Sequence, residues 1–105
     1  VWIADLDNLC ATVDPAILGA FLETRKRVMV EVVDKEAGDR GGIPVHAEGR
    51  LQVLEEFRLP VGFDAGRVRV FNTNTFLVDA EGLETAAISW QWFDGHKTVA
   101  GRTAL

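Results

Sequence analysis

The feature that most constrains the fold is the order of three segments at the start of the chain: an apolar run, a helix signal and a second apolar run. Residues 1–5, VWIAD, are rich in β-branched and aromatic types and indicate a buried strand, which suits a parallel sheet covered by helices. Asp14 and Pro15 are typical of a helix start, since the carboxylate can cap the helix and proline fits its first turn. Residues 27–33, RVMVEVV, predict another strand. Strand, helix and strand with short connections predict a βαβ unit with a right-handed crossover.

Turn signals divide the rest of the chain into shorter elements. Residues 43–46 and 51–54 flank a turn in which Gly49 supplies positive φ, so we expect a β-hairpin. Residues 67–79 provide further strand material, and residues 80–88 predict a short helix. The chain therefore falls in the α/β class, with a mixed sheet, flanking helices and an added hairpin.

A second turn signal, Asp94-Gly95, separates residues 90–93 from residues 97–100 near the end of the chain. The whole length of 105 residues allows one compact domain, and we find no internal repeat. Because the chain lacks an initiator Met and starts inside an apparent strand, we expect residues 1–105 to form a single partial domain, a fragment of a longer protein.

The charge and cysteine content exclude several classes of function. A net charge of −5 argues against non-specific binding to nucleic acid or to an anionic membrane. The sequence holds no apolar run of about 18 residues, the length that predicts a membrane-spanning helix. The single cysteine, Cys10, excludes an internal disulfide, and we expect it to be a buried, unreactive thiol. We therefore expect a cytoplasmic protein that binds neither nucleic acid nor membrane.

Two carboxylates, Asp5 and Asp7, follow the first predicted strand. In an open α/β sheet, ligands bind beyond the carboxyl ends of the strands. Two carboxylates there need a partner, and Mg²⁺ commonly binds one or two carboxylates together with substrate phosphates. If the strand continues through Asp7, both carboxylates face the same side. The alternative is that either carboxylate merely caps a loop or a helix.

Other polar residues could contact a ligand. Asn72 and Asn74 lie two apart, so on a strand they would share a face and offer donors and acceptors to sugar hydroxyls. The alternative is a structural hydrogen-bond network. The paired glycines 41 and 42 would let the backbone approach a ligand closely, or would form an ordinary loop. Strand alternation turns either Glu55 or Glu56 inward, whereas a solvated edge would leave both in water.

Three stretches of this sequence together resemble the UTP–glucose-1-phosphate uridylyltransferase (UDP-glucose pyrophosphorylase) family: IADLDNLCATVDPAIL, VEVVDKEAGDRGGIPVHAEGRLQVLEEFRLP and VFNTNTFLVD. Their order and spacing match the family and cover most of the chain. The resemblance implies a nucleotidyltransferase fold, a Rossmann-like sandwich of three layers. It also implies the reaction of UTP with glucose 1-phosphate to give UDP-glucose and pyrophosphate, with Mg²⁺ as the cofactor.

The first of these stretches carries the metal site implied by the resemblance. The family has Asn-Ser-Asp-Asn where this chain has Asp5-Leu6-Asp7-Asn8. Asp7 matches the metal-binding aspartate of the family, so the resemblance implies a catalytic role for Asp7 and contact with the substrate. Asp5 replaces an asparagine, and would either add a second acidic ligand or repel phosphate.

The other two stretches carry the implied substrate contacts. The family's Lys-Gly-Gly-Thr becomes Arg-Gly-Gly-Ile here, so Gly42 would still face the sugar although the threonine hydroxyl is gone. Glu55 matches an acidic residue expected at the hexose. Asn74 matches the sugar-binding asparagine of Asn-Thr-Asn, and Asn72 is the weaker match.

The 105 residues lack several active-site segments that the family's reaction needs. Other functions therefore remain open. The family's glycine-rich loop, its downstream lysine and most of its uridine pocket have no counterpart, so we expect the isolated chain to be inactive. One alternative is a related UDP-N-acetylhexosamine pyrophosphorylase. Another is a non-catalytic module that binds sugar phosphate. A third is self-association, because the open edges of a cut sheet favour pairing with another chain.

Overall fold

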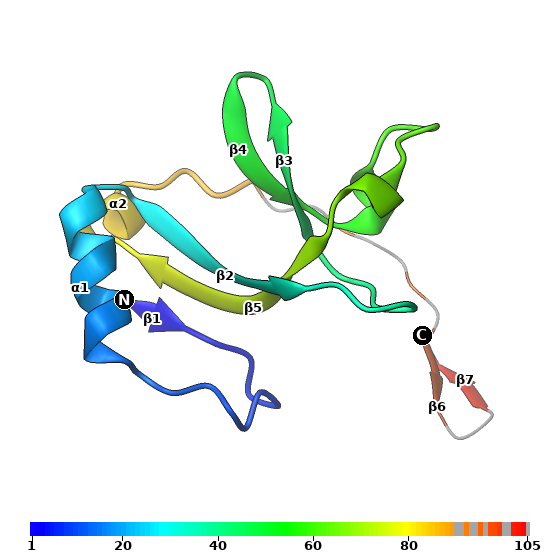
Figure 1. Ribbon diagram of the computed structural model, residues 1–105, viewed down its shortest axis with the longest axis horizontal. Helices are drawn as coiled ribbons and strands as arrows, with labels where there is room; N and C mark the ends of the chain where they lie inside the picture. Colours follow the sequence, from blue (N-terminus) through cyan, green and yellow to red (C-terminus); the bar gives the residue numbers. More distant parts are fainter. Residues whose placement is uncertain (90–91, 93–94, 96, 100–101, 105) are drawn as a thin grey trace.

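The computed structural model describes residues 1–89, 92, 95, 97–99 and 102–104, and Figure 1 shows their arrangement. Two α-helices and several short strands alternate along the chain, with two 3₁₀ turns between β4 and β5. In chain order the elements are β1 (Trp2–Ile3), α1 (Pro15–Thr24), β2 (Val28–Asp34), β3 (Ile43–Ala47), β4 (Arg50–Leu54), η1 (Glu56–Arg58), η2 (Ala65–Arg67), β5 (Val70–Val78), α2 (Ala80–Glu84), β6 (Lys97–Val99) and β7 (Arg102–Ala104).

The main sheet has three strands in the order β1-β5-β2. Both outer strands pair antiparallel with β5, in a register that sets Trp2 opposite Leu77 and Val28 opposite Val78. β1 and β2 therefore run in the same direction, as in a βαβ unit, but β5 lies between them. The two strands of the expected βαβ unit are thus present, but the strand pairs of this sheet are antiparallel in the described residues, so the parallel sheet that the first strand suggested is not found there. The expectation that the first strand is buried is also wrong, since Val1 and Ile3 are 57% and 43% exposed. Apolar residues indicate a strand, but they do not say which strand lies alongside it.

Helix α1 begins where the sequence predicts. The Asp14 carboxylate accepts a hydrogen bond of 2.7 Å from the backbone N–H of Ala16, and Pro15 opens the first turn. The helix ends at Thr24, and the C-cap residue Arg25 takes a left-handed conformation with φ of 52°. Of the apolar side chains on this helix, Phe21 is buried, whereas Leu22 remains 65% exposed. The described part of the chain thus covers only some of the apolar side chains of α1.

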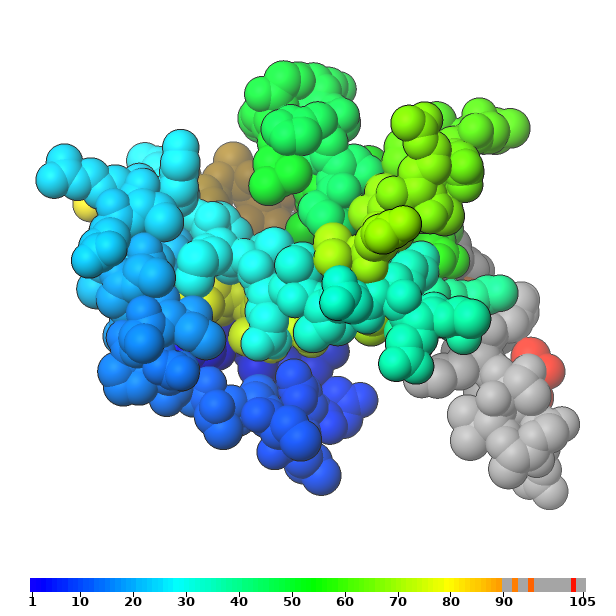
Figure 2. Space-filling model, in the orientation of Figure 1, coloured from blue at the N-terminus to red at the C-terminus, as the bar shows by residue number. Residues whose placement is uncertain are grey.

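The predicted β-hairpin is confirmed as β3 and β4. Its two-residue turn consists of Glu48 and Gly49, whose φ angles of 53° and 73° are typical of a type I′ turn. In Figure 1 the hairpin projects away from the three-stranded sheet, and in Figure 2 it forms a separate lobe. A hydrogen bond of 2.7 Å from the Asn72 N–H to the Gly42 carbonyl links the base of the hairpin to β5.

The segment after β5 agrees with the sequence only in part. Helix α2 is capped by Asp79, whose carboxylate accepts a hydrogen bond of 2.8 Å from the Gly82 N–H, and it is shorter than the predicted helix 80–88. Farther on, β6 pairs with β7. Residues 90–93, which the turn signal Asp94-Gly95 separates from residues 97–100, lie outside the described residues except for Trp92.

The hydrophobic core is small. In the described part of the chain, the buried apolar side chains are Phe21, Ile43 and Leu77, and they are joined by the buried polar residues Asn72 and Thr75. Cys10 is exposed, which contradicts the expected buried thiol, because the chain between β1 and α1 runs along the surface. None of the described helices has the length and the apolar content needed to cross a bilayer.

Candidate functional site

A bulge in β5 shapes the candidate site. Val30 lies opposite Phe76 and Val32 lies opposite Asn72, so the three residues Thr73 to Thr75 face only Glu31 of β2. Asn74, in the middle of the bulge, has a φ of 60°. Asparagine tolerates this left-handed conformation better than most residues with a side chain. The asparagine at position 74 is therefore compatible with the left-handed backbone in the middle of the bulge.

The two predicted amides meet across this bulge. The side-chain carbonyl of Asn72 accepts a hydrogen bond of 3.0 Å from the Asn74 backbone N–H. The Asn72 amide nitrogen donates in turn to the Asn74 side-chain oxygen at 3.1 Å. Asn72 is only 4% exposed, whereas Asn74 is exposed. Asn72 thus holds the bulge from inside, and Asn74 presents its amide to the outside.

Asp5 extends this network from the other end of the chain. The Asn74 side-chain nitrogen donates a hydrogen bond of 2.8 Å to a carboxylate oxygen of Asp5. β1 ends at Ile3, and the backbone of Asp5 opens a turn, accepting a hydrogen bond of 3.1 Å from the Asn8 N–H. The strand therefore does not continue through Asp7, which was our condition for both carboxylates to face the same side.

Gly42 and Glu55 lie at the other end of the network. The carbonyl of Gly42 receives the Asn72 N–H, as described above. A methyl group built on Gly42 would lie 2.7 Å from a methyl carbon of Val53 and 3.0 Å from a carboxylate oxygen of Glu55. The exposed carboxylate of Glu55 thus packs directly against Gly42. Asp5, Asn74, Asn72, Gly42 and Glu55 form a continuous series of contacts, which we call the polar row.

Asp7 is not part of the polar row, although it lies in the same turn as Asp5. It is exposed in the turn after β1, where its backbone carbonyl accepts a hydrogen bond of 3.0 Å from the Leu9 N–H. None of the hydrogen bonds found among the described residues joins its carboxylate to Asn74 or to Asp5. The structure therefore brings together five of the six residues singled out from the sequence, and the Asp7 carboxylate takes part in none of the hydrogen bonds that join them among the described residues.

Asp5 and Asp7, in the turn after β1, carry the type of ligand atom that Mg²⁺ binds, although too few such side chains lie together in the described part of the chain to surround an ion. Asp5 and Asp7 offer carboxylate oxygens, which are the ligands that Mg²⁺ prefers. Over the described residues, no group of three or more His, Cys, Asp or Glu side chains is placed to hold a metal ion. Mg²⁺ usually keeps waters and shares substrate phosphates, so one or two carboxylates suffice for the protein's part.

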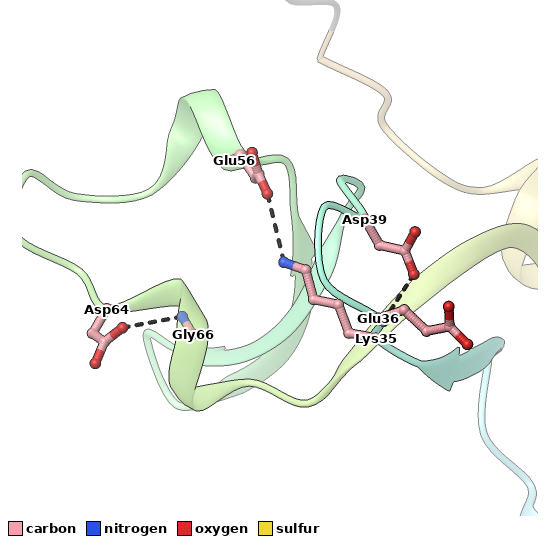
Figure 3. Close-up of polar contacts among 6 residues, drawn as sticks. All are labelled: Lys35, Glu36, Asp39, Glu56, Asp64 and Gly66. Atoms are coloured by element: carbon pink, nitrogen blue, oxygen red, sulfur yellow. Dashed lines mark hydrogen bonds and ion pairs between the residues drawn. The ribbon is translucent and has the colours of Figure 1, made fainter.

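Sequence reasoning missed an ion pair that ties η1 to the end of β2. The Lys35 ammonium lies 3.6 Å from a carboxylate oxygen of Glu56, and the two side chains are 16% and 38% exposed (Figure 3). Of the two adjacent glutamates, Glu56 is therefore the more enclosed, and Glu55 is left at the surface. Strand alternation could not give this result because β4 ends at Leu54 and η1 follows.

Two local turns flank this ion pair. The Asp39 carboxylate accepts a hydrogen bond of 2.9 Å from the Glu36 N–H, and the Asp64 carboxylate accepts one of 3.1 Å from the Gly66 N–H (Figure 3). Such carboxylates satisfy the backbone of their own turns. Asp39 and Asp64 thus have a structural explanation and are not candidates for the site.

A further contact that we did not predict lies beside the bulge. The Thr73 hydroxyl donates a hydrogen bond of 2.6 Å to the Glu31 carboxylate on β2. The two residues are 42 positions apart, and no local pattern in the sequence signals such a pair. This bond helps to fix the bulge against the neighbouring strand.

Comparison with known proteins gives one consistent family. A sequence model described as UTP–glucose-1-phosphate uridylyltransferase matches residues 1–100. A protein of that name from Musa acuminata is 32% identical over 115 residues, which cover 100% of this chain and 25% of the relative. The corresponding protein of Hordeum vulgare is 32% identical over 99% of this chain and 25% of its own length. That of Saccharomyces cerevisiae is 26% identical over 94% of this chain and 22% of its own length. The chain spans about a quarter of the length of these relatives.

Proposed function

The chain belongs to the UTP–glucose-1-phosphate uridylyltransferase family, and from this premise we propose that it forms the sugar-facing part of a uridylyltransferase active site. In the intact protein, a phosphate oxygen of glucose 1-phosphate would attack the α-phosphorus of UTP. The bond from that phosphorus to the bridging oxygen of the β-phosphate would break, releasing pyrophosphate and leaving UDP-glucose. The observation that carries the proposal is the polar row, which joins segments far apart in the chain.

Asn74 is the residue of the row best placed to bind a hexose hydroxyl. Its side chain is exposed, and one N–H group is already directed to Asp5 while the side-chain oxygen accepts from Asn72. A primary amide has a second N–H, which can donate to a ligand. Asn72 is a positioning residue, because the hydrogen bonds of its buried side chain to the described residues are both with Asn74.

Glu55 and Gly42 would form the second contact surface for the sugar. The Glu55 carboxylate can accept hydrogen bonds from two adjacent hydroxyl groups. Gly42 has no side chain between its backbone and that carboxylate, and a methyl group would lie only 3.0 Å from the carboxylate oxygen. The bare backbone at Gly42 therefore permits the Glu55 side chain to lie close to β3 beside the sugar.

Asp7, with Asp5 beside it, would hold Mg²⁺ in the loaded enzyme. The ion would neutralise phosphate charge, which is the main requirement of phosphoryl-type transfer together with alignment of the reactants. The residues of this chain contribute alignment: Asn74 and Glu55 orient the hexose so that its phosphate faces the nucleotide. Holding the reactants in line is itself a large part of catalysis in such reactions.

A binding experiment with a matched control tests this proposal. We expect glucose 1-phosphate to perturb the amide resonances of Asn74 and Glu55 in an NMR titration, and Glu55→Gln to weaken binding about tenfold through a lost charge-assisted hydrogen bond. Glu48→Gln is the control, because Glu48 is an exposed glutamate at the hairpin tip. Equal effects of the two substitutions, or no binding at millimolar ligand, would count against the proposed sugar site.

The same titration separates the other functions that the sequence left open. Stronger binding of N-acetylglucosamine 1-phosphate would favour a UDP-N-acetylhexosamine pyrophosphorylase. Binding that is unchanged by Mg²⁺ would favour a module without chemistry. We further propose that the isolated chain makes no UDP-glucose from UTP and glucose 1-phosphate, and turnover by the purified chain would refute this.

A further inference from the structure

The bulge in β5 interrupts the regular pairing of the strand at the residue that the sugar site depends on. Thr73, Asn74 and Thr75 all lie opposite Glu31, a single residue of β2. Residues that a bulge inserts are left unpaired in the ladder of a sheet. Their conformation must therefore be held by other contacts. Asn74, which presents the exposed amide of the polar row, is the middle residue of these three.

One contact of the bulge crosses to β2. The Thr73 hydroxyl donates a hydrogen bond of 2.6 Å to the carboxylate of Glu31. A length of about 2.5–2.7 Å is typical of an O–H group bonded to a carboxylate, and such bonds are roughly twice as strong as bonds between neutral groups. Among the described residues, no other side-chain hydrogen bond joins β2 to β5. Glu31 is therefore the side chain of β2 that acts on the bulge.

The bulge is tied to both neighbours of β5. Figure 1 shows β5 between β1 and β2. Thr73 is bonded to Glu31 of β2, and the next residue, Asn74, donates its side-chain N–H at 2.8 Å to Asp5, just after β1. Two successive residues are thus bonded to segments on opposite sides of their strand. The peptide group between them is held from both sides, together with the φ of 60° at Asn74.

We propose that Glu31 is a positioning residue of the sugar site and acts on Asn74 through Thr73. This inference rests on the proposed function, in which the Asn74 amide binds a hexose hydroxyl. Without the bond to Glu31, the Thr73 side chain is released and the bulge can adopt other conformations. The Asn74 amide is then directed to the hexose in only a fraction of the molecules, and the apparent affinity for the sugar falls by that fraction. Glu31 needs no contact of its own with the substrate.

Hydrogen exchange in the ligand-free chain tests whether Glu31 holds the bulge. The Asn74 backbone N–H donates to the Asn72 side chain within the bulge, so its exchange rate reports opening of the bulge. We expect Glu31→Ala and Thr73→Val each to speed this exchange about tenfold, and the double variant to exchange no faster than either. Thr73→Ser keeps the hydroxyl and should exchange at the native rate. Asp34→Ala, which removes another exposed carboxylate of β2, is the matched control.

Titration with glucose 1-phosphate tests whether the held bulge matters for binding. We expect Glu31→Ala and Thr73→Val to weaken binding about tenfold, and Thr73→Ser and Asp34→Ala to bind like the native chain. Gly49→Ala controls for stability, because it strains the tip of the hairpin, where φ is 73°, and leaves the bulge unchanged. It should unfold at lower urea concentration but bind the sugar phosphate with native affinity.

The outcomes separate this inference from the proposed function. Unchanged exchange of Asn74 in Glu31→Ala would overturn the positioning role even where the native chain binds the sugar phosphate. Faster exchange with unchanged affinity would confine the Glu31–Thr73 bond to stability, and would overturn it as well. A native chain that binds no glucose 1-phosphate would overturn the sugar site and with it the role of Glu31 in binding, whereas the exchange rates would still show whether Glu31 holds the bulge.

Discussion

Asn74 combines two roles that substitution can separate. It adopts φ of 60° and also donates its side-chain N–H to Asp5. For most residues the left-handed conformation costs roughly 1–2 kcal/mol, and glycine avoids this cost. We therefore expect Asn74→Ala to lower the free energy of unfolding by about 1–2 kcal/mol more than Asn74→Gly does. Urea unfolding of both variants measures this difference, and equal losses would show that the side-chain bond alone matters.

Gly42 is a close-packed position that a single methyl group should disturb. A Cβ there would lie 2.7 Å from a methyl carbon of Val53. Overpacking of this kind typically costs about 1–3 kcal/mol, so we expect Gly42→Ala to lower the free energy of unfolding by that amount. Val53→Ala removes the methyl groups that would clash.

A double-mutant cycle of these two substitutions, followed by urea unfolding, isolates the clash. We expect the double variant Gly42→Ala, Val53→Ala to be more stable than the sum of the single losses predicts. Strict additivity would show that Val53 is not the obstacle.

At the residue scale, the sequence indicated most of the candidate site but not the way it is assembled. Asp5, Asn72, Asn74, Gly42 and Glu55 were singled out from residue type, position and family resemblance, and the structure joins them in one series of contacts. The bulge that joins the two amides was not predictable from strand alternation. The pairs Thr73–Glu31 and Lys35–Glu56 were also missed, because tertiary proximity between distant segments leaves no local pattern.

At the scale of the elements, the hairpin turn offers a test of local chemistry. Glu48 has φ of 53° in the type I′ turn, a conformation that asparagine adopts more readily. We expect Glu48→Asn to raise the free energy of unfolding by about 0.5–1 kcal/mol. Gly49→Ala should lower it, since alanine is strained at the φ of 73° found at Gly49. Denaturant midpoints measure both changes, and a loss of stability in Glu48→Asn would contradict the assignment of the turn.

Elements with strong local signals were predicted well. Which strands pair with each other in the sheet was not predicted. Asp14 and Pro15 define the start of α1, and Gly49 defines the hairpin, because caps and turns depend on residues close in sequence. The position of β5 between β1 and β2 depends on pairing between distant segments. Periodicity marks a segment as a strand, but the hydrogen-bonding partners of that strand are set by tertiary structure.

At the scale of the whole molecule, the exposed apolar surface predicts low stability. Large hydrophobic side chains such as Leu6 and Leu9, at 99% and 92% exposure, contribute almost no burial. We expect the monomer to unfold with less than about 5 kcal/mol, the lower end of the usual range. Urea unfolding of the purified chain measures this value. A value of about 10 kcal/mol, well inside the usual range, would refute the expectation.

The central position of β5 also determines when this molecule can fold during synthesis. β1 and β2 leave the ribosome first, but both depend on a strand that begins only at Val70 for their backbone partners. The growing polypeptide therefore carries two unsatisfied strands until Val70 and the residues after it have been made, and the Asn72–Asn74 bulge arrives with the strand that closes the sheet. Sheet formation and assembly of the polar row should consequently occur as one late event, and a nascent chain that stops short of Val70 should have neither.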